Sequence, residues 1–303
     1  MKQEIVKTIE RLKKEKDAVI LAHYYVDGSV QEIADYVGDS FYLAKIAKQI
    51  NHQVIVFCGV RFMGESAKIL NPQKTVLLPD GAADCPMAHM VAEEKIEQMR
   101  KEYPDLAVVC YVNSTKALKA KSDVCVTSSN AVQIVKALPN KDVFFIPDEN
   151  LGRYVKEQVP EKNVILNDGF CPYHHKITAG QVRAEKEKHP QALVLTHPEC
   201  REEVLSLSDY IGSTAGIISF VQKSENKEFI VCTEHGVSYQ LEGLGKGKKF
   251  YFVSPCPVCA DMKKVTLEKV AHVLQTGENA VEMDEEERLC AMAPLERMLQ
   301  LAT

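Results

Sequence analysis

The chain has 303 residues, of which 46% are hydrophobic and 26% are charged, a composition typical of a globular protein with a sizeable buried core. Its formal net charge of −5 argues against a general electrostatic attraction to nucleic acid or to an anionic membrane, so the expected partner is a small molecule. No apolar run approaches the roughly 20 residues that span a bilayer, and residues 1–17 form a charge-rich amphipathic pattern without the apolar centre of a secretory signal. We therefore expect a cytoplasmic protein without a membrane segment.

Short β-branched runs alternate with helical segments along the chain, which predicts a parallel α/β architecture. After an N-terminal helix, nine strands are predicted, in three groups of three: 18–25, 53–59 and 74–80, then 106–113, 142–148 and 163–168, then 192–198, 228–234 and 249–255. The acidic run 284–288 is expected to begin a helix near the C-terminus.

The three groups repeat the same order of features. The first strand of each group ends on a polar side chain, namely His23, Asn113 and His197. A hydroxyl residue then precedes a helix, with Ser40, Ser128 and Ser213 spaced by 88 and 85 residues. The third strand leads to a Cys-Pro pair, with Cys85, Cys171 and Cys256 spaced by 86 and 85 residues. This self-similarity predicts three βαβαβ units related by a pseudo-threefold axis, at residues 1–102, 103–190 and 191–303, the last with additional C-terminal helices.

Ligands of open α/β sheets bind outside the carboxyl ends of the strands, so the three units are expected to direct their thiols and helix starts into one central cavity. Helix N-termini favour anions. The hydroxyls at these starts, including Thr214 beside Ser213, therefore suggest anion binding, although each could simply cap its helix.

Three cysteines in one cavity allow more than one metal. A structural zinc site normally has four protein ligands, whereas a [4Fe-4S] cluster held by three thiolates keeps one iron open. A zinc-deaminase interpretation also exists, because HPE at 197–199 followed by PCPVC at 255–259 satisfies the H-x-E…P-C-x-x-C signature. It leaves Cys85 and Cys171 unexplained.

The Cys256–Cys259 pair could also be a redox dithiol. By contrast, Cys58, Cys110 and Cys232 lie in or at the edge of apolar runs and are expected to be buried.

Short blocks in one order along nearly the whole chain resemble those of the quinolinate synthase family of NAD biosynthesis. The blocks are LAHYY, VGDS, FMGESAKILNP, DCPMAH, YVNST, TSSNAV, PDENLG, CPYHH, HPEC, GST, TEHG and CADMKK. The resemblance implies three α/β domains around a [4Fe-4S] cluster with one ligand from each domain. It also implies a condensation of iminoaspartate with dihydroxyacetone phosphate to quinolinate, phosphate and water.

The resemblance implies the cluster ligands Cys85, Cys171 and Cys259. The repeat spacing instead favours Cys256 as the third ligand, but the family's block falls on Cys259, and a loop can lengthen by three residues. His174 and His175 in CPYHH are expected to lie behind the site or at the surface rather than to act as ligands.

The resemblance also implies a set of residues around the substrates. Serine hydroxyls, helix N-termini and histidines suit the two carboxylates of iminoaspartate and the phosphate of its co-substrate. Tyr25, His197 and Glu199 are hypothesised to move protons during isomerisation and dehydration. The full substrate-binding set is His23, Ser40, Tyr111, Asn113, Ser128, His197, Glu199, Ser213 and Thr214.

Two further interpretations stay open. One is a radical enzyme of the diphthamide-synthesis type, which has a similar threefold architecture. The other is a non-catalytic iron-sulfur sensor, although no helix-turn-helix signature or basic arm accompanies the cysteines. Because iminoaspartate is unstable, the resemblance implies a functional link to L-aspartate oxidase or aspartate dehydrogenase.

Overall fold

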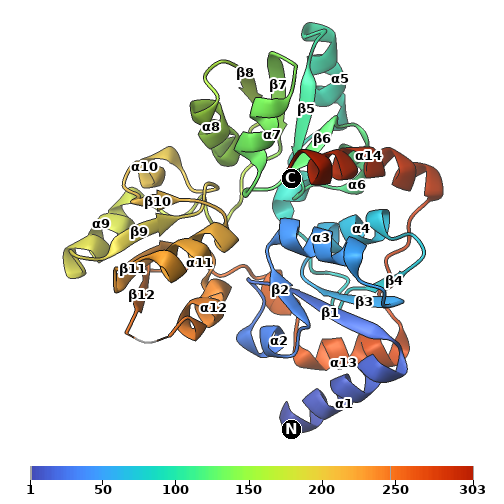
Figure 1. The fold of residues 1–303 in the computed structure, drawn as a ribbon. Helices are drawn as coiled ribbons and strands as arrows, with labels where there is room; N and C mark the ends of the chain where they lie inside the picture. Colours follow the sequence, from blue (N-terminus) through green and yellow to red (C-terminus); the bar gives the residue numbers. More distant parts are fainter. Residues whose placement is uncertain (1, 246, 303) are drawn as a thin grey trace.

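The computed structural model of the protein describes residues 2–245 and 247–302, and over these residues the strands form three parallel sheets of four strands each (Figure 1). The strand order is the same in every sheet: β2-β1-β3-β4, β6-β5-β7-β8 and β10-β9-β11-β12. The predicted α/β fold of three repeated units is confirmed. The strands are β1 (Ala18–His23), β2 (Tyr36–Gly38), β3 (Val54–Cys58), β4 (Thr75–Leu77), β5 (Ala107–Tyr111), β6 (Val124–Val126), β7 (Asp142–Ile146), β8 (Asn163–Leu166), β9 (Leu193–Thr196), β10 (Tyr210–Ile211), β11 (Glu228–Cys232) and β12 (Lys249–Phe252).

The prediction of three strands per unit was wrong, because each unit contains a fourth, short edge strand. These strands are β2, β6 and β10, and each pairs in parallel with the first strand of its unit. They are only two or three residues long, too short for an alternating or continuous apolar pattern to reveal them. Each leads directly to the turn that starts the next helix of its unit.

Helices connect successive strands and cover the sheets. In chain order they are α1 (Lys2–Glu15), α2 (Gly28–Glu32), α3 (Ser40–Gln49), α4 (Arg61–Leu70), α5 (Glu93–Glu102), α6 (Lys116–Ala120), α7 (Ala131–Ala137), α8 (Glu149–Gln158), α9 (Ala179–Lys188), α10 (Glu202–Leu205), α11 (Thr214–Lys223), α12 (Ser238–Gly243), α13 (Leu267–Thr276) and α14 (Glu285–Leu301). The predicted N-terminal helix and the helix start at the acidic run are confirmed, with Asp284 accepting hydrogen bonds from two backbone N–H groups of α14. No helix among the described residues is both long and apolar enough to cross a membrane.

The central strands of each sheet are buried on both faces, as expected when helices cover both sides of a parallel sheet. All six residues of β1 are buried, and β1 pairs with β3 from Ala18↔Val54 to Ala22↔Cys58. The expectation that Cys58, Cys110 and Cys232 are buried is confirmed.

The hydrophobic core is divided between the units. The first and second units share one large cluster of buried side chains, whereas the third sheet has its own clusters. The C-terminal helices do not stay with the third unit: α13 packs against α1 and β3, and α14 packs against α4, α6, α7 and β6 (Figure 1). Helix α9, which precedes residue 190, packs against β11 of the third sheet. The domain boundaries at 102 and 190 stay predictions.

The first and third units meet closely at Tyr25 and Gly236. A Cβ atom at Gly236 would lie 2.7 Å from backbone atoms of Tyr25, so only glycine allows this approach. Gln31 spans the same contact, since its Nε2 donates to the carbonyl oxygens of Tyr24, Val26 and Gly236 at 2.8 to 3.0 Å. The loop after β1 is thereby fixed against the third unit.

Candidate functional site

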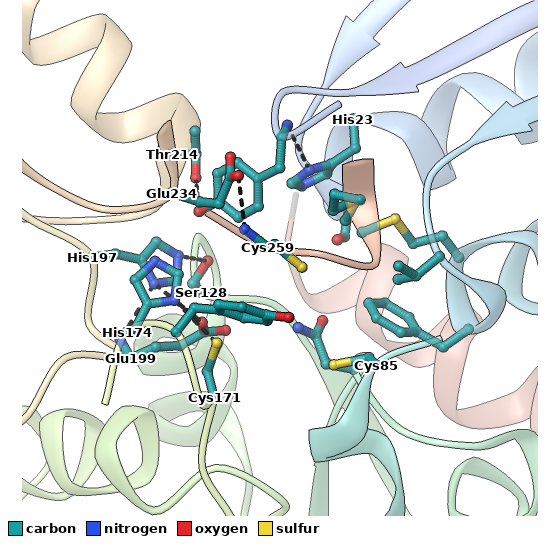
Figure 2. A pocket seen from close by; sticks show the side chains of 18 of the residues that line it. His23, Cys85, Ser128, Cys171, His174, His197, Glu199, Thr214, Glu234 and Cys259 are labelled. Atoms are coloured by element: carbon teal, nitrogen blue, oxygen red, sulfur yellow. Dashed lines mark hydrogen bonds and ion pairs between the residues drawn. The ribbon is translucent and has the colours of Figure 1, made fainter. Parts of the chain in front are cut away.

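A cavity lies where the carboxyl ends of the three sheets meet, and side chains from all three units line it (Figure 2). Most of the residues singled out in the sequence line this cavity: His23, Tyr25, Ser40, Cys85, Tyr111, Asn113, Ser128, Cys171, His197, Glu199, Thr214 and Cys259. Their convergence follows from the parallel topology, because the carboxyl ends of all strands in a sheet lie at one edge.

The two histidines at the ends of first strands, His23 and His197, are buried and held in fixed orientations. Nδ1 of His23 accepts the N–H of Tyr25 at 3.2 Å, and Nδ1 of His197 accepts the N–H of Glu199 at 3.3 Å. A neutral ring held in this way carries its proton on Nε2. Nε2 of His197 lies 3.2 Å from Oγ of Ser128. The third member of this set, Asn113, has a buried Oδ1 with no protein partner among the described residues, so it can accept a hydrogen bond from a ligand.

Burial keeps the two histidines neutral. Desolvation, followed by the mutual repulsion of the imidazolium forms, lowers the pKa of His23 to about 3, and desolvation lowers the pKa of His197 to about 3 as well. Both side chains are less than a tenth exposed. At neutral pH each ring therefore offers an N–H donor without a positive charge.

One cysteine from each unit faces the cavity: Cys85 at the start of the turn Pro86–His89, Cys171 after β8, and Cys259 after β12 (Figure 2). All three are free thiols. Cys256 does not line the described cavity. Burial raises the pKa of Cys85, Cys171 and Cys259, that of Cys259 to about 11, so a metal would have to displace their protons.

A carboxylate accepts the backbone N–H of each of these cysteines. Asp84 accepts from Cys85 at 2.8 Å, Asp148 from Cys171 at 3.1 Å, and Glu234 from Cys259 at 3.0 Å.

None of these three carboxylates was identified from the sequence. Asp148 and Glu234 each lie two residues beyond the end of a central strand, β7 and β11, and precede a helix or helical turn. The equivalent residue of the first unit is Val60, and there Asp84 supplies the acceptor instead. The recurring acidic residue after this strand was the available signal.

Replacing Asp148 by alanine should destabilise the protein. Its Oδ1 caps α8 by accepting the N–H of Leu151 at 2.8 Å, and its Oδ2 accepts the N–H of Cys171. Losing both bonds should cost about 2 kcal/mol or more in the free energy of unfolding, measured by urea denaturation. Thr266→Ala removes only a helix cap, that of α13, and should cost about 1 kcal/mol. Equal losses in the two variants would show that the Cys171 contact contributes nothing.

Glu199 is the centre of a buried hydrogen-bond network. Its Oε1 accepts the Tyr111 hydroxyl at 2.6 Å, and its Oε2 lies 2.7 Å from Nδ1 of His174. Burial alone would raise the pKa of Glu199, but His197, His174 and these hydrogen bonds outweigh it and lower the pKa. Burial, followed by the charge of Glu199, raises the pKa of Tyr111. At neutral pH the network therefore contains a carboxylate and a protonated phenol.

Tyr25 forms an adjoining network, which meets His174 at the Thr233 hydroxyl. Its hydroxyl lies 2.7 Å from Oγ1 of Thr214 and 2.9 Å from Oγ1 of Thr233. Its carbonyl oxygen accepts Nζ of Lys263 at 2.6 Å, and the same ammonium lies 3.2 Å from Glu234. Burial, and secondarily the charge of Glu199, raises the pKa of Tyr25, so its phenol is a proton donor at neutral pH.

The four hydroxyl residues at helix starts are not equivalent. Ser213 caps α11, since its Oγ accepts the N–H of Gly216 at 3.2 Å, and it does not line the described cavity. Thr214 is the first residue of α11, just as Ser40 is the first residue of α3, where Asp39 provides the cap. The true counterpart of Ser40 is therefore Thr214. Ser128 precedes the cap of α7 by two residues.

The expectation that His174 lies behind the site or at the surface was wrong. It is 2% exposed and lines the cavity, and its Nδ1 also lies 3.3 Å from Sγ of Cys171. The sequence signal was its position three residues after Cys171. His175 does not line the described cavity and contacts Asn150.

Fold and site together define a threefold α/β protein with a central cavity whose side chains suit metal binding. A family model described as "Quinolinate synthetase A protein" matches residues 7–300. Similar curated proteins named quinolinate synthase come from Fusobacterium nucleatum (54% identical over 97% of this chain and 98% of that protein) and Caldicellulosiruptor saccharolyticus (51%, over 99% of both). A third, from Clostridioides difficile, is 48% identical over 100% of this chain and 99% of that protein. The chain belongs to the quinolinate synthetase A protein family, and it is an enzyme.

The zinc-deaminase interpretation has no support in the geometry. It would need His197, Cys256 and Cys259 as neighbouring ligands, but Cys256 lies outside the lining of the cavity. Among the described residues, the potential metal ligands whose atoms lie close together are instead Cys171, His174 and Glu199. The family match over nearly the whole chain likewise disfavours the diphthamide-type enzyme and the sensor.

Proposed function

We propose that the protein is a quinolinate synthase that condenses iminoaspartate with dihydroxyacetone phosphate, giving quinolinate, phosphate and water. The observation that carries this proposal is the convergence of one cysteine from each unit on a cavity that also contains neutral histidines, a carboxylate and helix starts. The names of the full-length relatives support it. We further propose that the reaction takes place in the cytoplasm, as a step of NAD biosynthesis.

Cys85, Cys171 and Cys259 would hold a [4Fe-4S] cluster. Their thiols are free, and they do not form a single-ion group, as expected for ligands that bind different irons. Apolar side chains from the first unit and the last loop surround them, namely Val60, Phe62, Met63 and Met262. When bound, such a cluster supplies an open iron that acts as a Lewis acid.

The remaining groups would bind and orient the anionic substrates. The N–H groups of His23 and His197 suit carboxylates. A neutral imidazole N–H can donate a hydrogen bond to an anion, and it has no bound counter-ion that the substrate must first displace. The N-termini of α3 and α11 present Ser40 and Thr214, and Ser128 comes from the second unit. Asn113 Oδ1 would accept a substrate N–H or O–H. Ser213 would act only through the cap that fixes Thr214.

Proton transfer would fall to Glu199 and Tyr25, which both line the cavity. The Glu199 carboxylate, fixed by Tyr111 and His174, is suited to accept a proton from carbon next to an imine or carbonyl. The Tyr25 phenol, held between two threonine hydroxyls, is suited to donate one. His197, which lies between Glu199 and Ser128, would position the carboxylate and bind substrate.

The proposal is tested by measuring iron, sulfide and zinc in anaerobically purified protein and in four cysteine-to-alanine variants. We expect about four irons and four sulfides per chain, as a [4Fe-4S] cluster requires. They should be lost in Cys85→Ala, Cys171→Ala and Cys259→Ala, but kept in Cys256→Ala. Wild-type protein should also form quinolinate from the two substrates. Zinc that depends on Cys256 and Cys259, but not on Cys85, would contradict the proposal.

The unstable substrate also suggests a functional partner. Iminoaspartate would be supplied by L-aspartate oxidase or aspartate dehydrogenase. Adding either enzyme with its substrate to an assay should replace chemically generated iminoaspartate.

A further inference from the structure

Three potential metal ligands of different chemistry lie together at one side of the cavity. Sγ of Cys171, Nδ1 of His174 and a carboxylate oxygen of Glu199 all lie within 4.8 Å of one another. The closest pairs are Nδ1 to Oε2 of Glu199 at 2.7 Å and Nδ1 to Sγ at 3.3 Å. Figure 2 shows the three side chains grouped below His197, with Cys85 and Cys259 apart from them.

A second group orients each of these three residues. The backbone of Cys171 is fixed by Asp148, the Glu199 carboxylate by the Tyr111 hydroxyl, and Nε2 of His174 lies 2.8 Å from Oγ1 of Thr233. Metal-binding histidines commonly donate their second ring N–H in this way, which fixes the tautomer and directs the other nitrogen to the metal. The group therefore has the supporting contacts of a built metal site.

The donor set selects the kind of metal. One thiolate, one imidazole and one carboxylate match the ligands of Zn²⁺, and three protein ligands leave a fourth tetrahedral position open to the cavity. The thiolate and the carboxylate together carry two negative charges, which neutralise a divalent ion. Zinc–ligand bonds of about 2.0 to 2.3 Å would need only small adjustments of neighbouring side chains.

We propose that Cys171, His174 and Glu199 form a mononuclear Zn²⁺ site in the protein when it lacks the cluster. On binding, the thiol of Cys171 loses its proton to solvent. The proton of a neutral His174 moves from Nδ1 to Nε2 and stays there, and this N–H donates a hydrogen bond to Oγ1 of Thr233. Zinc and the cluster would exclude each other, because Cys171 would belong to both sites. This part of the inference rests on the proposed function. Zinc would also occupy the Glu199 carboxylate and so block substrate binding.

The experiment uses the full chain, reduced and stripped of metal with a chelator under anaerobic conditions. Co²⁺ is the spectroscopic probe, and Zn²⁺ is then added in competition. We expect one Co²⁺ per chain, with a sulfur-to-cobalt charge-transfer band and the intense visible bands of tetrahedral coordination, both abolished by one equivalent of Zn²⁺. Absence of the charge-transfer band in the wild type would overturn the proposal.

The variants separate this site from the cluster site. His174→Gln and Glu199→Gln should each weaken Co²⁺ binding at least about 100-fold, whereas Cys85→Ser, Cys259→Ser and the adjacent control His175→Gln should bind it as the wild type does. A band that survives in both His174→Gln and Glu199→Gln, or that disappears in Cys85→Ser, would overturn the proposal. Circular dichroism identifies any variant that fails to fold, and using two ligand variants keeps the test decisive.

Failure of this inference and failure of the proposed function give different results. Reconstitution with iron and sulfide should load His174→Gln with the cluster and fail in Cys85→Ser, the reverse of the cobalt pattern. A wild type that binds Co²⁺ as expected but forms no cluster would contradict the proposed function alone. A wild type that forms the cluster but shows no dependence of Co²⁺ on His174 and Glu199 would contradict this inference alone.

Discussion

Glu199→Gln is expected to lower kcat for quinolinate formation by about 1,000-fold while the cluster is retained. The carboxylate accepts Tyr111 through one oxygen and faces His174 with the other. An amide offers only one acceptor, so one buried donor would lose its partner, and the group could no longer accept a proton. The measurement is steady-state kinetics at matched iron and sulfide content.

The matched control for this variant is Tyr111→Phe, which removes one donor but leaves the charge. It should reduce kcat by a smaller factor, because the carboxylate can still act as a base. If Glu199→Gln retained wild-type kcat at equal cluster content, the proposed role of Glu199 in proton transfer would be wrong.

The second large effect expected is a loss of folding stability as the pH falls. Burial lowers the pKa of His23 and His197 to about 3, below the ordinary value of 6.5 that they regain on unfolding. The unfolded chain therefore binds more protons below pH 6.5, so stability is fully present above that pH and is lost as the pH falls towards 3. At pH 5 each histidine should cost about 2 kcal/mol, or about 4 kcal/mol for the pair.

Urea unfolding of the cluster-free protein at pH 7 and pH 5 measures this loss when the wild type is compared with histidine variants, because buried carboxyl groups with a raised pKa, such as Asp148 and Glu234, act in the opposite direction in all of these proteins. The range stays above the ordinary pKa of glutamate, so Glu199 should contribute little. His23→Gln and His197→Gln should each flatten the dependence by about half. The same slope in the wild type and in both variants would refute the assignment to the buried histidines.

The sequence predicted the parts of the fold that depend on long apolar runs and on repetition. The central strands and the threefold repeat were visible because a strand buried on both faces, such as β1 or β5, is continuously apolar. Edge strands of two or three residues, such as β10, carry no such pattern. Their existence depends on pairing with the first strand of the unit, which is a tertiary interaction.

The residues of the candidate site also fall into those that a strand pattern predicts and those that only tertiary packing brings to the site. His23, Asn113 and His197 were found because each ends a recognisable strand of a repeat. His174 was misplaced because only the packing of the second unit on the third brings its ring within 4.7 Å of the His197 ring and next to Glu199. Ser213 and Thr214 are adjacent, and which of them caps the helix is decided by backbone geometry at a single residue.

The divided hydrophobic core has a consequence for how the protein unfolds. Since the third sheet packs on its own clusters, with Tyr154 as a side chain that contacts both parts, the chain need not behave as one cooperative unit. In amide hydrogen exchange, the third sheet should open without the other two. A ligand that takes one bond from each unit adds its binding free energy to the cost of that opening. Filling the central cavity would then turn separately opening parts into a single cooperative structure, and slower exchange in β9 and β11 would report it.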